Sequence, residues 1–318
     1  MAVPRAGRRQ VDEALHWAIA QLAGTDEPVL SARMLLAHVL GCSTTDLFVH
    51  PERTLSASER ASYEALIVRR RQHEPVAYLV GHRVFMEFDL QVDERVLIPR
   101  PETEQLVEGA IAAVAARPWP QPRVADIGTG SGAIAISLAR HLSSAQIWAV
   151  DSSPGAIEVA RENARRYGIL ERITFLTGDL LAPLPGPVDL IVANLPYVSE
   201  DEYASLPAGI RRYEPRQALL AGQDGLSAIR ALLRTASAHL EKDGVVLLEI
   251  GATQGSVVTK LACAAFPGAD ISLLPDLAGH DRVIRIERAH LAERAHLAER
   301  AHPAEQPPTE VRTPERTS

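Results

Sequence analysis

Cysteine is nearly absent from this chain of 318 residues, which contains only Cys42 and Cys263. The two do not form a C-x-x-C pair, and neither stands at a ligand-like spacing from histidine. Disulfide frameworks and structural zinc sites need several cysteines at characteristic spacings. The sequence therefore predicts neither a disulfide scaffold nor a metal site, and we expect both thiols to be free and buried.

Long apolar runs are also missing. The longest, such as residues 245–250, fall far short of the roughly 20 apolar residues that a membrane-spanning helix needs. The chain does not open with the charged and then apolar pattern of a secretory signal. With 46% hydrophobic and 23% charged residues, the composition is that of a globular protein longer than one average domain. We expect it in the cytoplasm, away from membranes.

An excess of positive charge is the third absence. The formal net charge is -7, whereas proteins that bind long nucleic acids rely on many Lys and Arg contacts to phosphate. The charge therefore argues against direct nucleic-acid binding.

The N-terminal part has the pattern of a small helical domain. Two stretches with apolar residues at helical spacing come first, and the second is expected to start at Ser31 as its N-cap and to stop at Gly41. A third helix is predicted after Ser56, because Ser56 and Glu59 have the spacing of a capping box. We assign residues 1–75 to this all-α domain.

The pattern then changes to that of strands. Between residues 81 and 92 apolar side chains alternate, which predicts a β-hairpin linker over residues 76–95. Beyond it, short apolar runs alternate with segments long enough for helices, as in a doubly wound α/β fold with a mostly parallel sheet. The connection at 275–282 is too short for a helical crossover, so the last two strands should pair antiparallel. We assign residues 96–286 to this α/β domain and expect its strands at 124–127, 147–150, 173–176, 190–193, 245–250, 271–274 and 283–286.

Residues 287–318 read as a separate tail. It repeats Glu-Arg-Ala-His-Leu-Ala with a period of six and then becomes rich in proline, threonine and charge. A six-residue step turns a helix by about 600°, so His290 and His296 would not share a face and make a poor metal pair. We expect a partly helical or disordered appendage.

A glycine-rich turn follows the first predicted strand of the α/β domain. Gly128-Thr129-Gly130-Ser131-Gly132 stands between that strand and a helix predicted over residues 133–141. Small residues let a ligand approach the backbone closely, and a helix N-terminus offers unpaired N–H groups. Alone, the turn also fits a NAD-type dinucleotide loop or a plain tight turn.

Acidic residues end the next two predicted strands. Asp151 stands about 20 residues past the glycines, where a carboxylate can accept both ribose hydroxyls. Asp179 follows the third strand, where it could accept from an adenine amino group while the N–H of Leu180 donates to the ring. Each residue alone could be a helix cap or a turn. Together with the glycines, at the carboxyl ends of consecutive strands, they predict an adenosine-containing cofactor.

The tetrapeptide Asn194-Leu195-Pro196-Tyr197 follows the fourth predicted strand. An amide nitrogen is a poor nucleophile because its lone pair is delocalised, so an enzyme must hold and orient it. The Asn194 side-chain carbonyl and the Leu195 backbone carbonyl can accept its two N–H bonds, Pro196 stiffens the turn, and Tyr197 packs on the planar group. The tetrapeptide thus indicates transfer of a methyl group to a planar nitrogen, mainly through orientation. A turn with a core tyrosine is the alternative.

The glycine turn and the tetrapeptide together resemble class I methyltransferases that act on nitrogen. Further segments narrow the resemblance to the glutamine methyltransferases of peptide chain release factors, namely residues 74–81, 97–104, 214–219 and 276–282, with Phe85 and Phe88. The match spans roughly residues 11–286. It implies a seven-stranded methyltransferase sheet, S-adenosylmethionine as the cofactor, and methylation of the side-chain amide nitrogen of the glutamine in the Gly-Gly-Gln tip of release factors.

The resemblance also implies roles for individual residues. Those carried over are Gly128, Thr129, Gly130, Ser131 and Gly132 at the methionine end of the cofactor, Asp151 at its ribose, Asp179 and Leu180 at its adenine, Asn194 at both cofactor and substrate, Leu195, Pro196 and Tyr197 at the glutamine, and Arg100 and Glu102 in a segment over the site. Asn194, Pro196 and Tyr197 are the candidate catalytic residues. Leu195 stands where the family commonly has proline, and Leu180 where some members carry an aromatic residue.

Other functions remain open at this point. A glutamine methyltransferase of a ribosomal protein would use the same site with another docking surface. A DNA adenine methyltransferase uses a comparable tetrapeptide, but the flipped base needs a basic channel that the net charge does not favour. A non-catalytic module that binds release factors would keep the fold without turnover. We expect a monomer whose partner is a release factor.

Overall fold

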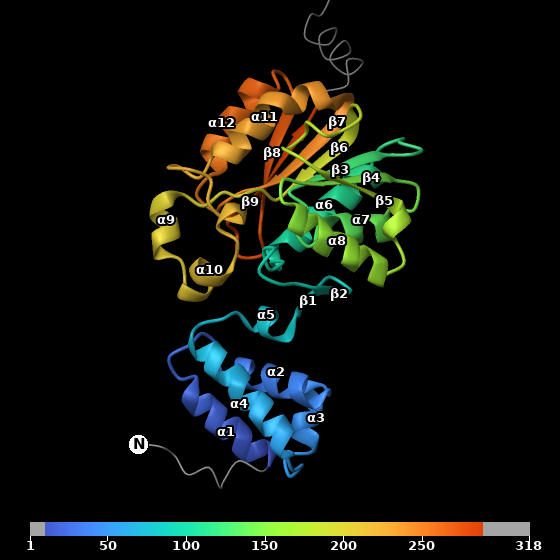
Figure 1. The fold of residues 1–318 in the computed structure, drawn as a ribbon. Helices are drawn as coiled ribbons and strands as arrows, with labels where there is room; N and C mark the ends of the chain where they lie inside the picture. The colour runs from blue at the N-terminus through green and yellow to red at the C-terminus, as the bar shows by residue number, and fades with distance from the viewer. Residues whose placement is uncertain (1–9, 289–318) are drawn as a thin grey trace, which may run out of the picture.

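The computed structural model describes residues 10–288, and its N-terminal part is a bundle of helices (Figure 1). Helices α1 (Val11–Gln21), α2 (Pro28–Leu40), α3 (Thr44–Val49) and α4 (Ala57–Arg71) share a hydrophobic core of their own. Tyr63 of α4 is 1% exposed, and its hydroxyl donates to the Ala32 carbonyl of α2 at 2.9 Å. The helical domain predicted from the sequence is confirmed. The tail predicted from residue 287 lies, beyond Arg288, outside the described residues.

The ends of these helices show which sequence signals act. Gly41 ends α2 with a left-handed φ of 61°, and Ser56 begins α4 with a capping box, both as expected. The N-cap predicted at Ser31 is wrong, because α2 begins one turn earlier at Pro28. Proline suits the first helical position, where the backbone N–H would have no partner. Ser31 is instead buried within the helix, where the Arg70 Nε donates to its hydroxyl at 3.2 Å.

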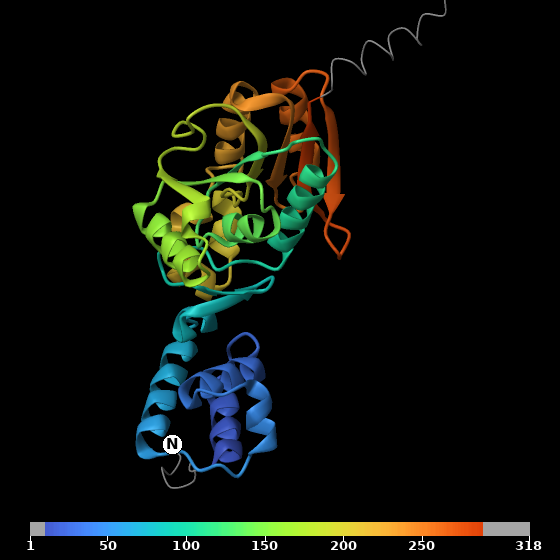
Figure 2. The same cartoon turned by 90° about the vertical axis from the view of Figure 1, so that its right-hand side faces the viewer.

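A short helix and a hairpin join the bundle to the rest of the chain, and Figure 2 shows them between the helical bundle and the part that contains the large sheet. They are α5 (Val76–Val80) and the antiparallel strands β1 (His82–Phe85) and β2 (Phe88–Gln91). Leu79 and Val80 pack in the helical core, so that core extends past residue 75, the boundary expected from the sequence. Phe85 and Phe88 belong to the core of the sheet. Each end of the linker is therefore anchored in a different core.

The C-terminal part is built on a seven-stranded sheet with the order β5-β4-β3-β6-β7-β9-β8. Strands β3 to β7 run parallel, and β9 is antiparallel to both β7 and β8. The prediction of a mostly parallel sheet with an antiparallel end is confirmed. The strands are β3 (Arg123–Ile127), β4 (Gln146–Asp151), β5 (Ile173–Thr177), β6 (Val188–Ala193), β7 (Leu240–Glu249), β8 (Asp270–Pro275) and β9 (Asp281–Glu287).

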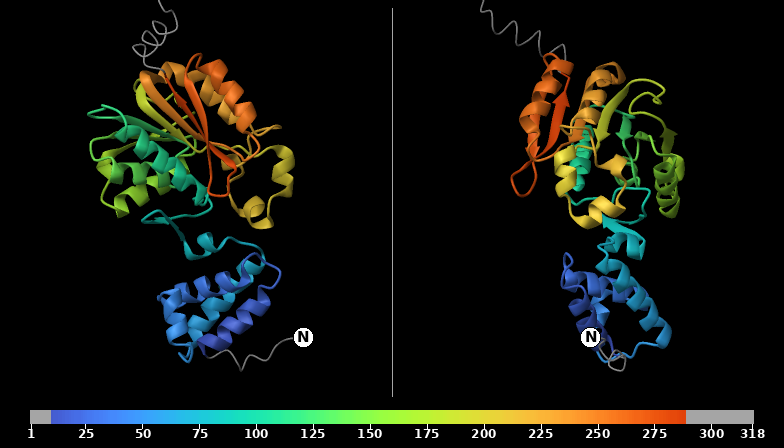
Figure 3. Two further views of the ribbon diagram at one scale, coloured as in Figure 1. Left: turned by 180° about the vertical axis from the view of Figure 1, so that it is seen from behind. Right: turned by 60° about the vertical axis from the view of Figure 1, so that its left-hand side comes forward.

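Helices cover both faces of this sheet (Figure 3). Successive strand residues point to opposite faces, so Val124 packs in one core and Ala125 in the other. The first core takes side chains from α6 (Glu102–Ala115), α7 (Ala133–His141) and α8 (Pro154–Arg166), and the second from α11 (Ser227–His239) and α12 (Gly255–Ala265). Two short helices, α9 (Glu200–Ser205) and α10 (Ala208–Tyr213), lie between β6 and α11. Among residues 10–288 no helix is long and apolar enough to cross a membrane.

Two further expectations from the sequence are wrong. Residues 178–187, between β5 and β6, form turns without a helix. Pro183, Pro185 and Pro187 explain this, because each lacks an N–H donor and its ring clashes with a preceding helical turn. The cysteines are free but not buried, since Cys42 is only half-buried and Cys263 is exposed on α12.

Gly132, which precedes α7, offers a test of the packing beneath the glycine turn. Its φ is +83°, and a Cβ placed there would lie 3.1 Å from the Ala160 Cβ and 3.1 Å from the Ile136 Cδ1. Gly168, after α8, also has a positive φ of +67° but open space around it. We expect Gly168→Ala to lower the free energy of unfolding by about 1 kcal/mol through backbone strain alone. Gly132→Ala should lower it by a further 1–3 kcal/mol, roughly, through overpacking. Urea unfolding without ligand measures both, and equal losses would contradict the packing described.

Candidate active site

The strand order reverses beside β3, and a pocket opens there at the carboxyl ends of the strands. β3 is flanked by β4 on one side and by β6 on the other. In doubly wound sheets the loops on either side of such a point diverge and leave a crevice for a ligand. The pocket is lined from four strand ends, by residues 127–131, 150–153, 178–180 and 194–196, together with parts of the linker and the loop before α11.

The glycine turn forms the floor of this pocket. Gly128, Gly130 and Gly132 have φ values of +78°, +56° and +83°. The turn therefore depends on a left-handed backbone conformation that residues other than glycine rarely adopt. Thr129 and Ser131 are nearly fully buried. The N-terminus of α7 follows at once, and its N-cap residue, Gly132, has no side chain to cap the first N–H groups of the helix. The predicted turn is present between the predicted strand and helix.

Asp126 precedes this turn and holds its shape through two hydrogen bonds. It was not among the predicted site residues. Its Oδ2 accepts from the Thr129 hydroxyl at 2.7 Å and from the Ala135 N–H at 3.1 Å. Its Oδ1 is buried and has no hydrogen-bond partner among the described residues. Burial raises the pKa of Asp126 to about 7, although both hydrogen bonds act in the opposite direction. A buried acceptor without a partner indicates that a donor is still to be supplied.

Asp151 ends β4 and is held rigidly at the pocket. Its Oδ2 accepts from the Gly130 N–H at 2.9 Å and its Oδ1 from the Ser153 N–H at 2.9 Å. Burial raises the pKa of Asp151, while the backbone hydrogen bonds to Ser153 and Gly130 oppose that rise. A carboxylate oxygen can accept two hydrogen bonds. Both oxygens therefore keep acceptor capacity for a pair of ribose hydroxyls.

Asp179 and Leu180 also line the pocket, at its third strand end. Asp179 is exposed, whereas Leu180 is half-buried and packs against the second core. Leu180 adopts a positive φ of +46°, which is rare for a branched side chain. Such backbone strain is concentrated at functional sites, and here it directs the turn after β5 along the pocket wall.

Only part of the tetrapeptide lines the pocket. Asn194, Leu195 and Pro196 do, but the Tyr197 ring lies behind them, where a Cβ added to Gly251 would be 3.5 Å from its Cδ2. Burial, and then the charge of Glu249, raise the pKa of Tyr197 to about 12, so its hydroxyl stays protonated. The backbone carbonyl of Tyr197 accepts from the Gln254 side chain at 2.9 Å, which fixes the end of the turn.

Leu195, the departure from the family pattern, is 4% exposed and packs in the second core. A Cβ placed on Gly128 would lie 3.2 Å from the Leu195 Cδ2 and 3.3 Å from the Asn194 carbonyl oxygen. The tetrapeptide and the glycine turn therefore touch. Burial of the leucine side chain anchors the turn where a proline ring would otherwise restrict it.

Thr103 and Glu249 complete the site, and sequence reasoning missed both. The Asn194 Nδ2 donates to the Thr103 Oγ1 at 3.0 Å, and the Thr103 hydroxyl donates to the Glu249 Oε2 at 2.7 Å. Thr103 is 4% exposed and Glu249 1% exposed. Glu249 ends the apolar strand β7, as Asp151 ends β4, so its position at the carboxyl edge was a usable signal.

Arg100 lines the pocket and reaches across it to a distant segment. Its Nη2 donates to the Glu214 Oε1 at 2.6 Å, and the other oxygen of this buried carboxylate accepts from the Ile98 N–H at 3.2 Å. Glu102, the second residue predicted in this segment, is exposed in the first turn of α6 and does not line the pocket. Its assignment to the substrate stays a prediction.

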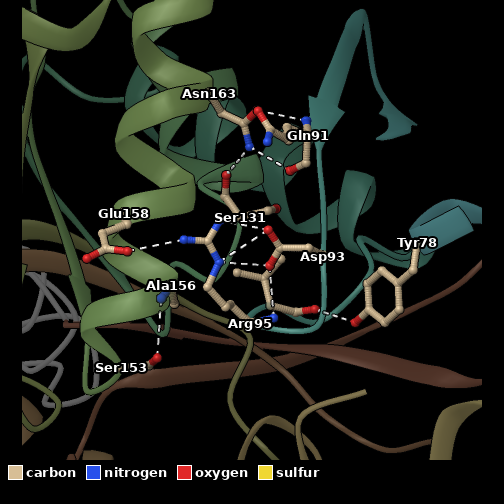
Figure 4. Close-up of polar contacts among 10 residues, drawn as sticks. Tyr78, Gln91, Asp93, Arg95, Ser131, Ser153, Ala156, Glu158 and Asn163 are labelled. Carbon is tan, nitrogen blue, oxygen red and sulfur yellow. Dashed lines mark hydrogen bonds and ion pairs between the residues drawn. The ribbon is translucent and has the colours of Figure 1, made fainter. Parts of the chain in front are cut away.

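The linker contributes Arg95 to the pocket lining, and Figure 4 shows the polar contacts that join the linker to its surroundings. Asn163 of α8 is fully buried, and its Nδ2 donates to the Gln91 carbonyl and to the Ser131 carbonyl, each at 2.9 Å. Nearby, Arg95 pairs with Asp93 at 2.7 Å and lines the pocket. The hairpin is therefore joined to the glycine turn through the Asn163 side chain.

This fold, with a glycine turn after β3, an acidic residue after β4 and an Asn-x-Pro-Tyr turn after β6, defines a class I S-adenosylmethionine-dependent methyltransferase. Two family models match the chain, described as the PrmC N-terminal domain over residues 13–81 and a methyltransferase domain over residues 124–213.

Curated relatives narrow the class. A release factor glutamine methyltransferase of Moorella thermoacetica is 42% identical over 273 residues, which cover 85% of this chain and 95% of the relative. One of Rhodopirellula baltica is 39% identical over 270 residues, covering 84% and 91% respectively. A solved ribosomal protein L11 methylase of Lactobacillus delbrueckii matches 65% of this chain and 90% of its own, at 26% identity and a TM-score of 0.45. The chain belongs to the release factor glutamine methyltransferase family.

The residues present fit S-adenosylmethionine, the methyl donor of this family. Gly128 and Gly130 line the pocket without side chains, and Asp151 lines it with acceptor capacity left. Asp126, which does not line the pocket, keeps a buried acceptor without a partner among the described residues. These features suit a ligand with an amino group and a pair of hydroxyls. Which residue holds which group remains a prediction from the sequence.

The role of Asp151 can be tested by replacing its carboxylate. Hydrogen bonds to a charged acceptor are worth about 1.5–3 kcal/mol, so Asp151→Asn should weaken S-adenosylmethionine binding by about 10–100-fold. Asp179→Asn, at an exposed position, should weaken it less. Calorimetric titration measures the affinities, and thermal unfolding without ligand checks that the Gly130 and Ser153 contacts survive. Unchanged affinity in Asp151→Asn would contradict the assignment.

Proposed function

We propose that this protein transfers a methyl group from S-adenosylmethionine to the side-chain amide nitrogen of the glutamine in the Gly-Gly-Gln motif of peptide chain release factors. The observation that carries the proposal is the orientation of Asn194. Its amide N–H group is directed to Thr103, so its oxygen remains as an acceptor, and both Asn194 and Leu195 line the pocket. The names of the curated relatives, which match over most of their own length, support the choice of substrate.

The tetrapeptide acts by orientation. The Asn194 Oδ1 and the Leu195 carbonyl accept the two N–H bonds of the glutamine amide, which places the face of its nitrogen towards the cofactor. Bound S-adenosylmethionine supplies the electrophilic methyl group. Pro196 restricts the turn, and Tyr197 supports it from behind through packing. Correct orientation of two reactants can contribute about 7–11 kcal/mol, so the arrangement needs no nucleophilic side chain.

The helical part is proposed as the docking domain for the substrate protein. A groove lined from α2, the linker and α10 lies beside Arg100, next to the cofactor pocket. The two parts touch at this groove, where a Cβ added to Gly209 would lie 2.6 Å from the His73 carbonyl oxygen and the Tyr213 hydroxyl donates to the Gln72 carbonyl at 3.3 Å. The proposed division is residues 1–75, 76–95 and 96–286, with the tail at 287–318.

The partner and the place of action follow from the substrate. A release factor is a translation protein, so we propose that the enzyme works in the cytoplasm as a monomer and recognises protein without direct contact to nucleic acid. The negative net charge of -7 supports the last point.

Substrate specificity provides the test of this function. Incubation with labelled S-adenosylmethionine should label a release factor but not its Gly-Gly-Glu variant. A site built from acceptors rejects a group that lacks the matching donors by a factor on the order of 10⁴. Mass spectrometry should place a single methyl group on the tip glutamine. Equal labelling of both substrates would refute the proposal, and a ribosomal protein that outcompetes the release factor would redirect it.

A further inference from the structure

Three polar side chains from distant parts of the chain form a line that leads from the pocket wall, where Asn194 and Thr103 lie, to Glu249 behind it. Asn194 follows β6, Thr103 lies in the first turn of α6, and Glu249 ends β7. The Asn194 Nδ2 and the Thr103 Oγ1 are 3.0 Å apart, and the Thr103 Oγ1 and the Glu249 Oε2 are 2.7 Å apart. Thr103 and Glu249 are almost fully buried, so water has little access to the contact between them.

The chemistry of the three groups gives this line a direction. An ionised carboxylate accepts hydrogen bonds and cannot donate. The proton of the Thr103 hydroxyl must therefore point to Glu249, which leaves the Thr103 oxygen to accept from Asn194. Asn194 can satisfy this only with its NH₂ group. Its amide oxygen is then turned away from Thr103, towards the pocket.

We propose that Glu249 is a positioning residue that, through Thr103, fixes the Asn194 amide with its oxygen towards the substrate and so makes the site selective for a substrate N–H donor. The inference rests on the proposed function for the identity of that donor. Neither Glu249 nor Thr103 reacts. Their part is to remove the alternative orientation of Asn194, in which its NH₂ group would face the substrate and favour an acceptor such as a glutamate side chain.

The surroundings of Glu249 support a carboxylate at this position. Arg282 of β9 and the Tyr197 hydroxyl favour its charged form, whereas Glu102 of α6 and, above all, burial oppose it. Burial raises the pKa of Glu249 to about 6. A glutamine would fit the space but could present either its oxygen or its NH₂ group to Thr103, so it would lose the unique direction.

Protonation of Glu249 should allow the donor and acceptor roles in the two hydrogen bonds of this line to be exchanged. The neutral carboxyl can donate to the Thr103 oxygen, whose proton is then free to point to Asn194, and the Asn194 amide can turn its oxygen inward. The sign follows from the raised pKa, because the active orientation is present above pH 6 and lost as the pH falls through about 6.

Nuclear magnetic resonance tests the line without any substrate. The side-chain NH₂ signals of Asn194, identified by their loss in Asn194→Ala, should shift with a midpoint near pH 6 in the wild type. The shift should be absent in Glu249→Gln. An unchanged signal across this range in the wild type, or the same transition in Glu249→Gln, overturns the inference, whatever the substrate proves to be.

Kinetics with a release factor test its consequence. Thr103→Val removes the hydroxyl and keeps the shape, whereas Thr103→Ser keeps the hydroxyl and is the matched control. We expect kcat to fall about 10–100-fold in Thr103→Val and to stay within about threefold of wild type in Thr103→Ser, because a misplaced group costs rate more than binding. The rates are compared at saturating S-adenosylmethionine, with the cofactor affinity of each variant measured by calorimetry, so that weaker cofactor binding is separated from a loss of kcat. Glu249→Gln should melt no lower than wild type at pH 7, since it removes a buried charge.

The outcomes separate the two proposals. Equal kcat in Thr103→Val and Thr103→Ser overturns the role of the line in catalysis. A wild type that labels no release factor contradicts the proposed function, and the resonance transition then still decides whether Glu249 orients Asn194.

Discussion

The pairing of β3 with β6 sets the position of every group in the site. Val124 pairs with Leu190, although the whole of β4 and β5 lies between them in the chain. The chain leaves β3 through α7 towards β4 and returns on the other side, so the loops after β3 and β6 open away from each other. The close packing of Gly128 against Leu195 keeps them in contact at the base. The distance between the cofactor turn and the tetrapeptide is thus a property of the sheet rather than of either loop.

Hydrogen bonds join the linker to the glycine turn and to the segment that lines the pocket. Asn163 holds Gln91 of the hairpin and Ser131 of the glycine turn with one side chain. The Tyr78 hydroxyl donates to the Val96 carbonyl at 2.6 Å, which connects α5 to the segment that lines the pocket. A protein bound between the two domains would therefore contact linker backbone that hydrogen bonds hold in a fixed position relative to the glycine turn. The linker thus ties the helical domain to segments that line the pocket.

Sequence reasoning found the features whose signals are local. The strand ends at Asp151 and Asn194 were predictable because an apolar run followed by a polar residue marks the carboxyl edge of a parallel sheet. Ser31 was misread because Pro28, three residues earlier, is the stronger start signal. A helix was wrongly expected after β5 because the length of the segment was considered without its prolines.

The contact of Thr103 with Glu249 lay beyond such reasoning. It joins residues 146 positions apart, and only the packing of α6 over β7 brings them together. Arg100 and Glu214, 114 positions apart, are a similar case. Sequence patterns located many of the residues that line the pocket, although the predicted Gly132, Tyr197 and Glu102 do not line it. The contacts that hold the lining residues in place come from tertiary packing.

Two buried carboxylates, Asp126 and Glu249, lie at the same edge of the sheet, and their burial lowers the stability of the fold. Burial raises the pKa of Asp126 to about 7 and that of Glu249 to about 6. Because these values lie above the usual range near 4, the stability linked to each neutral carboxyl is fully present below about pH 4 and is lost as the pH rises through 6 to 7.

At neutral pH the ionised Glu249 and the ionised fraction of Asp126 therefore lower the free energy of unfolding relative to its value at low pH. Apolar residues would pack these positions at no such cost, but they could not direct the neighbouring donors. Asp126 fixes the Thr129 hydroxyl and the start of α7, and Glu249 fixes the Thr103 hydroxyl. A carboxylate is an acceptor in every orientation, so each one imposes a single direction on the groups beside it. The loss of stability is thus the physical consequence of holding the turn and the tetrapeptide in one defined orientation.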